Sequence, residues 1–207
     1  MRGKFIVFEG GEGAGKSSTI AWLKGELPEG EFTFTREPGG TANAEEIREI
    51  IVAHRRDDLD PLTLILLFEA ARREHMQSTI LPALESGKHV ICDRFSASTY
   101  AYQIVAGAGS VYRQFFLDSD SLVCGDTAPS HTILFDVEPE VGFLRKNNSG
   151  EHLNVFDEKD SAFHHAVRSG MKEYLKDKPH MVIDAGKSQQ AVREEVKRII
   201  LSLMNHG

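Results

Sequence analysis

The segment Gly10-Gly11-Glu12-Gly13-Ala14-Gly15-Lys16-Ser17 matches the pattern G-x-x-x-x-G-K-[ST] at every position. Apolar and β-branched residues at 4–9 predict a buried strand before it, and residues 17–27 have the apolar spacing of a helix. A strand, a glycine-rich turn and a helix N-terminus bind phosphate well. Backbone N–H groups point inward, the helix dipole is positive there, and glycines allow the chain to come close.

This segment therefore predicts a phosphate-binding loop (P-loop) for a nucleoside triphosphate. Lys16 is expected to reach the β- and γ-phosphates, and the Ser17 hydroxyl to hold Mg²⁺. The residues expected around the phosphates of ATP are Gly10, Gly11, Glu12, Gly13, Ala14, Gly15, Lys16, Ser17 and Ser18.

Length and composition predict a single domain, spanning residues 1–207. The chain is 41% hydrophobic and 27% charged, which is ordinary for a globular protein. Its net charge of −7 argues against binding to nucleic acid, because proteins that bind the phosphate backbone are usually basic. No apolar run approaches the length of a membrane span, and Cys92 and Cys124 form no metal or redox spacing. We therefore expect a cytoplasmic protein that contacts neither membrane nor nucleic acid.

Strand and helix patterns alternate along the chain, which predicts a parallel sheet covered by helices on both faces. The expected strands are Phe5–Phe8, Phe32–Thr35, His89–Cys92, Thr132–Val137 and Met181–Ile183. The expected helices are Ser17–Leu27, Ala42–Ala53, Pro61–Glu85, Ser96–Ala106, Ser110–Leu122, Phe163–Lys176 and Gln189–Met204. Asp60 and Ser188 are the expected N-caps of the third and last helices. The polar stretch 146–158 fits neither pattern and suggests a lid over the domain at about 143–160.

Cationic side chains follow the second and third strands. Arg36 comes directly after one and Asp93-Arg94 after the other, while the P-loop follows the first. Because the carboxyl ends of parallel strands meet at one edge of a sheet, these cations are expected to converge near the γ-phosphate. They outnumber what one triphosphate needs, so a second phosphorylated ligand is expected. Phe68 and Arg72 lie four apart on one helix face, where an aromatic ring and a guanidinium suit a base, although a core phenylalanine beside a solvated ion pair would look the same.

Three segments besides the P-loop narrow the family: Thr35-Arg-Glu-Pro-Gly-Gly-Thr41, Phe68-Glu-Ala-Ala-Arg72, and Val90-Ile-Cys-Asp-Arg-Phe95 with Ser98-Thr-Tyr-Ala-Tyr-Gln103. Together they closely resemble the thymidylate kinases, a branch of the nucleoside monophosphate kinases. The resemblance covers residues 1 to about 103 and resumes weakly near 134–137 and 183–185. It implies an α/β fold of P-loop NTPase type, a three-layer sandwich in which a five-stranded parallel sheet is flanked by helices. It also implies a homodimer and the ATP-dependent phosphorylation of dTMP to dTDP.

The same resemblance implies roles for single residues. Phe68 would stack on thymine, Arg72 would bond a ring carbonyl, and Arg94 would hold the acceptor phosphate while Asp93 lies near Mg²⁺. Glu12 would face the deoxyribose 3′-hydroxyl with help from Tyr102. The full set expected at the acceptor nucleotide is Glu12, Arg36, Pro38, Phe68, Arg72, Arg94, Ser98, Thr99, Tyr102 and Gln103. The metal ligands would be Ser17 and Asp93, and the catalytic cations Lys16, Arg94 and one from the lid.

Two stretches depart from the family pattern. The expected lid offers only Arg145, Lys146 and Lys159, and the turn 104–109 after Gln103 carries no arginine. Arg145 is the candidate lid cation, with a solvated charge on a helix face as the alternative. Two further readings stay open: a kinase for another pyrimidine deoxynucleotide, such as dUMP or a 5-substituted relative, and a nucleotide-binding module with impaired catalysis.

Overall fold

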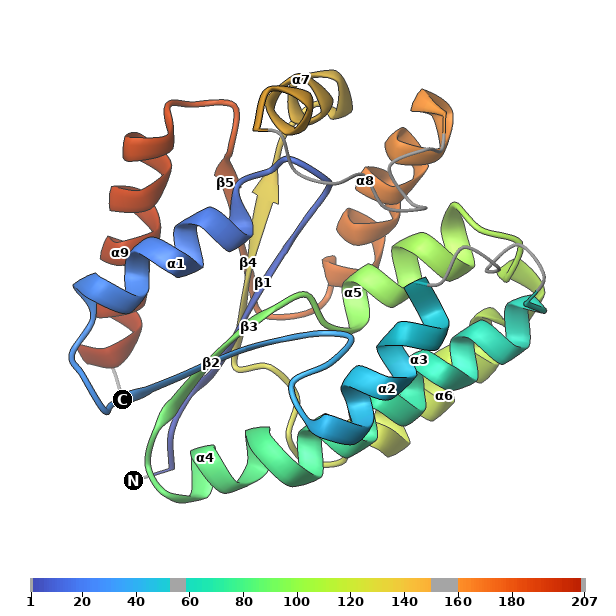
Figure 1. Ribbon diagram of the computed structural model, residues 1–207, viewed down its shortest axis with the longest axis horizontal. Helices are drawn as coiled ribbons and strands as arrows, with labels where there is room; N and C mark the ends of the chain where they lie inside the picture. The colour runs from blue at the N-terminus through green and yellow to red at the C-terminus, as the bar shows by residue number, and fades with distance from the viewer. Residues whose placement is uncertain (1, 53–58, 150–159, 206–207) are drawn as a thin grey trace.

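A five-stranded parallel sheet forms the centre of the molecule, with helices packed on both of its faces (Figure 1). The computed structural model describes residues 2–52, 59–149 and 160–205. The strands lie in the order β2-β3-β1-β4-β5 and all pairs are parallel. Their bounds are β1 Phe5–Gly10, β2 Phe32–Arg36, β3 His89–Asp93, β4 His131–Asp136 and β5 His180–Asp184. The five predicted strands and the predicted sheet are therefore confirmed.

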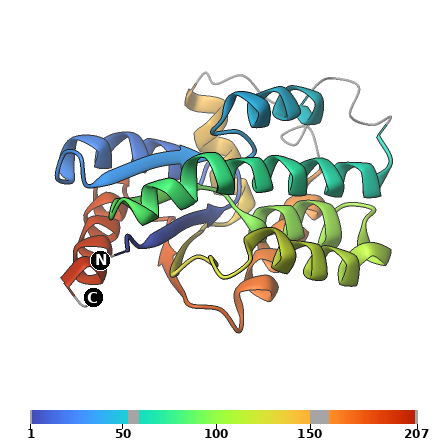
Figure 2. The ribbon, with the colours of Figure 1, turned by 90° about the horizontal axis from the view of Figure 1, so that it is seen from below.

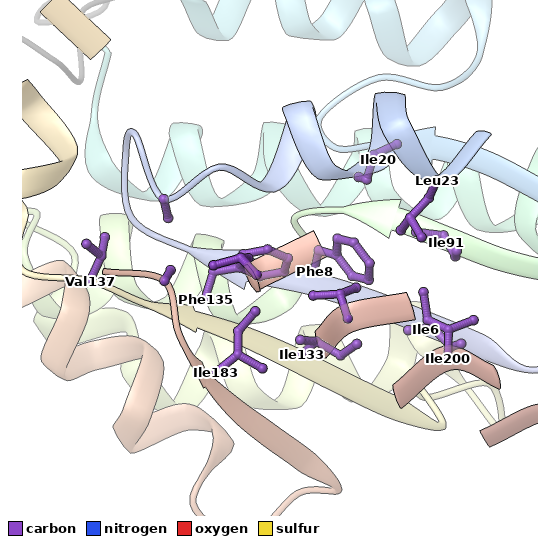
Figure 3. Close-up of a cluster of buried hydrophobic side chains, with 14 of the residues drawn as sticks. Ile6, Phe8, Ile20, Leu23, Ile91, Ile133, Phe135, Val137, Ile183 and Ile200 are labelled. Carbon is purple, nitrogen blue, oxygen red and sulfur yellow. The ribbon is translucent and has the colours of Figure 1, made fainter. Parts of the chain in front are cut away.

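Strand β1 lies at the centre, and all six of its residues are buried. Its alternate side chains enter different layers, as the two-residue period of a strand requires. Ile6 and Phe8 pack among apolar residues of α1 (Lys16–Glu26) and α9 (Gln189–Asn205) on one face (Figure 3). Phe5 and Val7 pack on the opposite face. This two-sided burial fixes β1 rigidly, and with it the loop that follows Gly10.

The opposite face is covered by the helical segments η2 (Met76–Ile80), α4 (Leu81–Glu85), α5 (Ser96–Thr99), η3 (Tyr100–Val105) and α8 (Ser161–Leu175). Two of them, α5 and η3, contribute Ser98, Thr99 and Tyr102 to the candidate site. Helices α2 (Ala42–Val52), α3 (Pro61–His75) and α6 (Arg113–Cys124) pack beside them, and Figure 2 shows α2, α3 and α6 side by side. The short 3₁₀ turn η4 (Ser110–Tyr112) leads into α6.

The predicted helix over 61–85 is confirmed as helical but not as regular. It runs through α3, η2 and α4 without a break, and η2 is wound as a π-helix. Pro82 explains the change, because proline has no N–H to donate and its ring presses on the carbonyl four residues earlier. Asp60 caps α3 as expected: its Oδ1 accepts from the N–H groups of Leu62 and Thr63 at 2.9 and 3.3 Å. Ser188 Oγ likewise accepts from the Ala191 N–H at 3.3 Å, as an N-cap of α9 should.

The sequence pattern missed one helix, α7 (Pro139–Ser149). Seven of its residues, 143–149, fall in the predicted lid, and residues 150–159 of that lid lie outside the described residues. Among residues 139–146 of this helix few side chains are buried, so its apolar periodicity is too weak to indicate a helix. Among helices of the described ranges, none combines the length and apolar character that a membrane crossing needs.

Candidate active site

A cavity of about 870 Å³ opens where strands β1, β2 and β3 end. Because these strands are neighbours in the sheet, their carboxyl ends bring the P-loop, Arg36 and Asp93-Arg94 to one place, as the sequence predicts. The cavity wall contains most residues of both predicted ligand sets. They are Glu12, Gly13, Ala14, Gly15, Lys16, Ser17, Ser18, Arg36, Pro38, Phe68, Arg72, Asp93, Arg94, Ser98, Thr99, Tyr102 and Arg145.

The P-loop needs glycine at two positions for different reasons. Gly15, directly before α1, has a left-handed backbone with φ of +88°. Gly13 has φ of +65°, and a Cβ there would lie 2.0 Å from the carbonyl oxygen of Gly142 on α7. The loop is therefore pressed against α7 as well as bent back on itself.

Lys16, the first residue of α1, folds back over the P-loop. Its Nζ donates to the carbonyl oxygens of Gly10 and Gly11 at 2.8 and 3.0 Å. The side chain is buried, and burial together with the nearby Arg94 guanidinium lowers the pKa of Lys16 to about 8. Among the described residues its hydrogen-bond partners are these two carbonyl oxygens, and a buried ammonium of this kind is a strong site for an anionic group.

Ser17 and Asp93 meet beside Lys16. The Ser17 hydroxyl donates to Oδ2 of Asp93 at 2.6 Å. The other carboxylate oxygen, Oδ1, is buried and has no hydrogen-bond partner within the described part of the chain. One hydroxyl oxygen and a carboxylate with an unused buried oxygen form a donor set that suits a hard cation such as Mg²⁺.

Glu12 is the centre of a charged cluster at the P-loop. Its Oε1 accepts from Arg94 at 2.7 Å and from the Tyr102 hydroxyl at 3.0 Å, and its Oε2 lies 3.2 Å from Nζ of Lys146. Burial raises its pKa, but Arg94, Lys16 and Lys146 outweigh burial and hold the pKa of Glu12 far below its ordinary value. Glu12 is thus an ionised acceptor near Tyr102, where the sequence places it.

Arg94 joins the P-loop to α5. It is the one non-glycine residue with positive φ, 67°, in the described ranges. Its guanidinium donates to the Gly10 carbonyl and to Ser98 Oγ, both at 3.1 Å, as well as to Glu12. This left-handed backbone turns the side chain back toward the loop end of β1, and such strain is commonly kept at functional sites.

Phe68 and Arg72 lie on α3 at the other end of the cavity. Arg72 is almost fully buried and makes charged contacts with Glu37 at 3.0 Å, with Asp120 at 3.5 Å and with Glu69. Its Nη2 donates to Thr99 Oγ1 at 2.7 Å, so these contacts account for four of its five N–H groups. The ion pairs of Arg72 are therefore buried, unlike the solvated ion pair considered as the alternative.

Comparison with known proteins identifies the family. A family model described as thymidylate kinase matches residues 8–196. The chain belongs to the thymidylate kinase family. A thymidylate kinase of Symbiobacterium thermophilum is 39% identical over 95% of this chain and 92% of its own length. One of Magnetococcus marinus is 41% identical over 96% of this chain and 95% of its own length. The solved thymidylate kinase of Ehrlichia chaffeensis is 30% identical, covers 97% of this chain and 99% of its own, and superimposes with a TM-score of 0.74.

Family membership confirms the resemblance and the fold class predicted from the sequence. Four of the predicted site residues nevertheless lie differently from what was expected in a thymidylate kinase. Gly10 and Gly11, at the start of the P-loop, are absent from the cavity wall. Gln103 is buried in η3 and is absent from the cavity wall. Arg145 lies on the cavity wall, but its guanidinium donates to the backbone carbonyls of residues 185–187 after β5, at 2.5 to 3.1 Å. Its predicted alternative, a solvated charge, is wrong; its catalytic role stays a prediction.

Sequence reasoning missed several polar residues of the wall in this family member, and Glu37, Arg48 and Lys146 are three of them. The others are Thr19, Lys187, Ser188 and Gln189. Arg48 donates to the Pro38 carbonyl at 3.0 Å. Helical spacing could have indicated this position. Arg48 lies four residues after Ala44 and three before Ile51, so it shares a helix face with these two residues, which are both fully buried. Lys146 is 8% exposed and reaches Glu12, which no local pattern in a polar stretch could indicate.

Proposed function

We propose that this chain transfers the γ-phosphoryl group of ATP to dTMP, giving dTDP and ADP. Membership in the thymidylate kinase family supports the reaction class, and the relatives named above favour dTMP over other pyrimidine nucleotides. One observation carries the proposal: a single cavity joins a P-loop to a buried arginine and a phenylalanine suited to a base. A donor and an acceptor nucleotide could therefore meet end to end.

The charge of the cavity wall supports two phosphorylated ligands. Its cationic residues are Lys16, Arg36, Arg48, Arg72, Arg94, Arg145, Lys146 and Lys187. Its acidic residues are Glu12, Glu37 and Asp93. Several of these cations are buried, where they interact with phosphate more strongly than they would in water.

We assign the donor phosphates to the P-loop, residues 10–18. Lys16 would leave its two carbonyl partners for the β- and γ-phosphates, and the α1 N-terminus would face them. Ser17 and Asp93 would hold Mg²⁺, since their oxygens are 2.6 Å apart and Asp93 Oδ1 is unused. The ion would neutralise phosphate charge and help to orient the phosphates.

We assign the acceptor to the residues between P-loop and α3. Arg94 and Arg36 would hold its phosphate, Phe68 would stack on the base and Arg72 would donate its remaining N–H to a ring carbonyl. Ser98, Thr99 and Pro38 would complete the wall around base and sugar, and Glu12 with Tyr102 would accept and orient the 3′-hydroxyl.

The chemistry needs positioning and charge stabilisation more than proton transfer. The acceptor phosphate is already an anionic nucleophile, so no general base is assigned. A phosphate oxygen of dTMP forms the new bond to Pγ, and the bond from Pγ to the bridging oxygen of ADP breaks. Lys16 and Arg94 would stabilise the charge on the transferred group. Arg145, as the proposed lid cation, would have to leave the carbonyls it binds.

We further propose a cytoplasmic homodimer with one kinase domain. Free thiols at Cys92 and Cys124 are consistent with a reducing compartment. Exposed apolar residues on α3 and α6, namely Leu66, Phe115 and Leu122, support self-association.

The test is an assay of ADP release with ATP·Mg²⁺ and, in turn, dTMP, dUMP, dCMP, dGMP and AMP. We expect release that depends on the acceptor and is fastest with dTMP. If ADP release were faster with dUMP or dCMP, that nucleotide would replace dTMP as the assigned acceptor. Bound ATP without acceptor-dependent release from any nucleotide would overturn the proposed kinase activity.

A further inference from the structure

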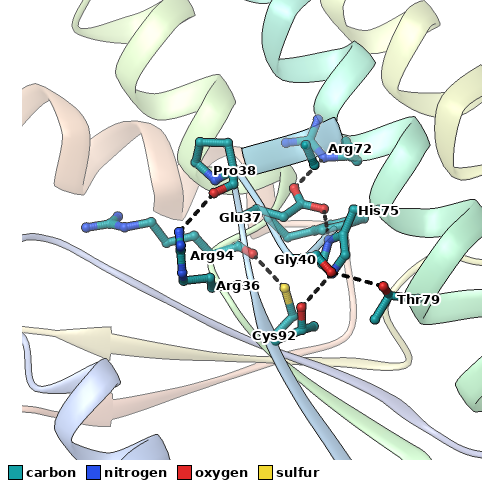
Figure 4. A network of polar contacts seen from close by, with 12 residues as sticks. Arg36, Glu37, Pro38, Gly40, Arg72, His75, Thr79, Cys92 and Arg94 are labelled. Carbon is teal, nitrogen blue, oxygen red and sulfur yellow. Dashed lines mark hydrogen bonds and ion pairs between the residues drawn. The ribbon is translucent and has the colours of Figure 1, made fainter. Parts of the chain in front are cut away.

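His75 is a buried imidazole with no role in the mechanism proposed above. It is the last residue of α3 and has no exposed surface. Both ring nitrogens have partners. Nδ1 lies 3.0 Å from Oε1 of Glu37 (Figure 4), and Nε2 lies 2.6 Å from Oγ1 of Thr35. The ring therefore joins α3 to the end of β2 and to the residue that follows it.

The direction of these hydrogen bonds follows from the partners. An ionised carboxylate can only accept, so Nδ1 carries a proton and donates to Glu37. In a neutral ring Nε2 then accepts from the Thr35 hydroxyl, which fixes the tautomer. Glu37 uses its second oxygen, Oε2, to accept from Nε of Arg72 at 3.0 Å. The contacts form a chain from Thr35 through His75 and Glu37 to Arg72.

Close packing holds the ring in this orientation. A Cβ on Gly40 would lie 2.5 Å from Nε2 of His75 and 2.6 Å from Oγ1 of Thr35, so only glycine fits there. The Thr79 hydroxyl donates to the Gly40 carbonyl at 3.1 Å and ties this loop to η2. The imidazole is thus enclosed by β2, α3 and the loop after Pro38.

Glu37 is the link between this ring and the acceptor site. Glu37 and Arg72 both line the cavity, whereas His75 does not. Arg72 is held at Nη1 and Nη2 by Glu69, Asp120 and Thr99, and at Nε by Glu37. If the Glu37 carboxylate rotated, the guanidinium would lose its Nε partner and its remaining N–H would change direction.

We propose that His75 is a positioning residue for recognition of the acceptor base. It holds the Glu37 carboxylate, and Glu37 aims the Arg72 guanidinium at the base. This inference rests on the proposed function, because it assigns Arg72 to a carbonyl of thymine. The proposal takes this carbonyl to be the one at the 4-position, since the 2-carbonyl is common to thymine and cytosine. A guanidinium that donates there accepts the thymine carbonyl and disfavours cytosine, which has an amino donor at that position. His75 is therefore expected to support discrimination between dTMP and dCMP without touching either.

Two conservative variants separate this role from a purely structural one. In His75→Asn the amide nitrogen can occupy the place of Nδ1 and keep the hydrogen bond to Glu37. In His75→Gln the amide reaches the place of Nε2, so the contact with Thr35 is kept and the contact with Glu37 is lost. Thr79→Val is the matched control, because it disturbs the same loop through Gly40 but leaves Glu37 and Arg72 untouched.

The experiment measures steady-state kinetics, calorimetric binding of dTMP and dCMP, and thermal unfolding for the full chain and each variant. For His75→Gln we expect the KM for dTMP to rise roughly tenfold, which is the effect of one lost hydrogen bond to a charged group. The ratio of kcat/KM for dTMP over dCMP should fall by a similar factor, with the KM for ATP within about twofold of the parent. His75→Asn and Thr79→Val should stay within about threefold of the parent in that ratio.

Equal loss of discrimination in His75→Asn and His75→Gln, or none in His75→Gln, would overturn the inference. So would a parallel rise in the KM for ATP, which would indicate general loosening of the fold. If the unsubstituted protein bound no dTMP in the calorimeter, the proposed function and this inference would both fall. Binding of dTMP that is the same in every variant would overturn the role of His75 alone.

Discussion

Lys16 illustrates how a residue that we assign to the active site lowers the stability of the folded protein. Its ordinary pKa of 10.5 is lowered to about 8 in the folded protein, chiefly by burial. That difference corresponds to roughly 3 kcal/mol at pH values below 8, where both folded and unfolded chains keep the proton. The Lys16 ammonium is thus destabilised by its burial in the P-loop, and the negative charge of a bound triphosphate would stabilise it.

We predict that Lys16→Met stabilises the free protein at pH 7 by roughly 1 to 3 kcal/mol, while phosphoryl transfer is lost. The gain is the relieved desolvation, reduced by about 1 kcal/mol for the lost bonds to Gly10 and Gly11. As pH rises from 8 to 10.5 the folded parent releases its proton and the unfolded chain does not. The parent is therefore stabilised over this window, and its difference from the variant should shrink.

Urea unfolding of both proteins from pH 7 to 10 provides the measurement. Lys24→Met is the control, since Lys24 is an exposed lysine of the same helix. It should change stability by no more than about 0.5 kcal/mol and leave activity intact. A parent that is more stable than Lys16→Met at pH 7 would contradict the argument.

At the scale of elements, α7 and the P-loop meet through two glycines. A Cβ on Gly142 would lie 2.2 Å from the carbonyl oxygen of Glu12, and one on Gly13 would lie 2.0 Å from the Gly142 carbonyl. The adjacent Lys146–Glu12 ion pair, at 3.2 Å, is buried against this contact. Any side chain at position 142 must move α7 away from the P-loop.

We predict that Gly142→Ala lowers kcat roughly tenfold and raises the KM for ATP, although alanine favours a helix over glycine by about 1 kcal/mol. Gly25→Ala is the matched control: Gly25 lies in α1, and a Cβ there would contact nothing within 4 Å. It should gain stability and keep parental kinetics. Because both variants alter the same ion pair, Gly142→Ala and Lys146→Met should combine less than additively. Parental kinetics in Gly142→Ala would refute a role for this contact.

Elements with strong periodicity were predictable, and those held by tertiary contacts were not. The strands of the sheet are apolar and bounded by turn residues, so all five were found. Helix α7 was missed because its position depends on Gly142 and Lys146, which meet a loop about 130 residues earlier in the chain. The π-helical winding of η2 likewise depends on Pro82 in an otherwise regular helix.

The residues of the candidate site also fall into two groups, those that the sequence could predict and those that depend on tertiary contacts. The P-loop, Arg36 and Asp93-Arg94 follow strand ends, so topology brings them together and sequence order is sufficient to predict it. Gln103 and Arg145 depend on side-chain direction. Gln103 lies in a π-helical stretch that rotates the residues after Tyr100, and Arg145 finds carbonyl acceptors beyond β5 that no local pattern specifies.

At the scale of the whole molecule, several apolar side chains remain exposed on α3, on α6 and in the turn η4 before α6. Leu66 of α3, Val111 beside α6, and Phe115 and Leu122 of α6 are 48, 81, 41 and 81% exposed. Phe115 and Leu122 are seven residues apart and share one face of α6, and α3 packs against α6 (Figure 2). An exposed apolar surface on adjacent helices is typical of a self-associating protein, and a two-fold dimer would cover it with the same surface of a second copy.

We predict that the protein sediments as a dimer and that Phe115→Asp with Leu122→Asp converts it to a monomer, because each carboxylate would be buried twice in a two-fold interface. Sedimentation velocity over a range of concentrations is the measurement. Leu201→Asp is the control, since Leu201 is 39% exposed and belongs to α9, a helix that lies away from α6 (Figure 1). It should leave the dimer intact.

A monomeric parent protein, or a double variant that remains dimeric, would show that the α3–α6 surface serves another purpose. Because α3 also carries Phe68 and Arg72, a true interface there should make the KM for dTMP, more than that for ATP, sensitive to dissociation.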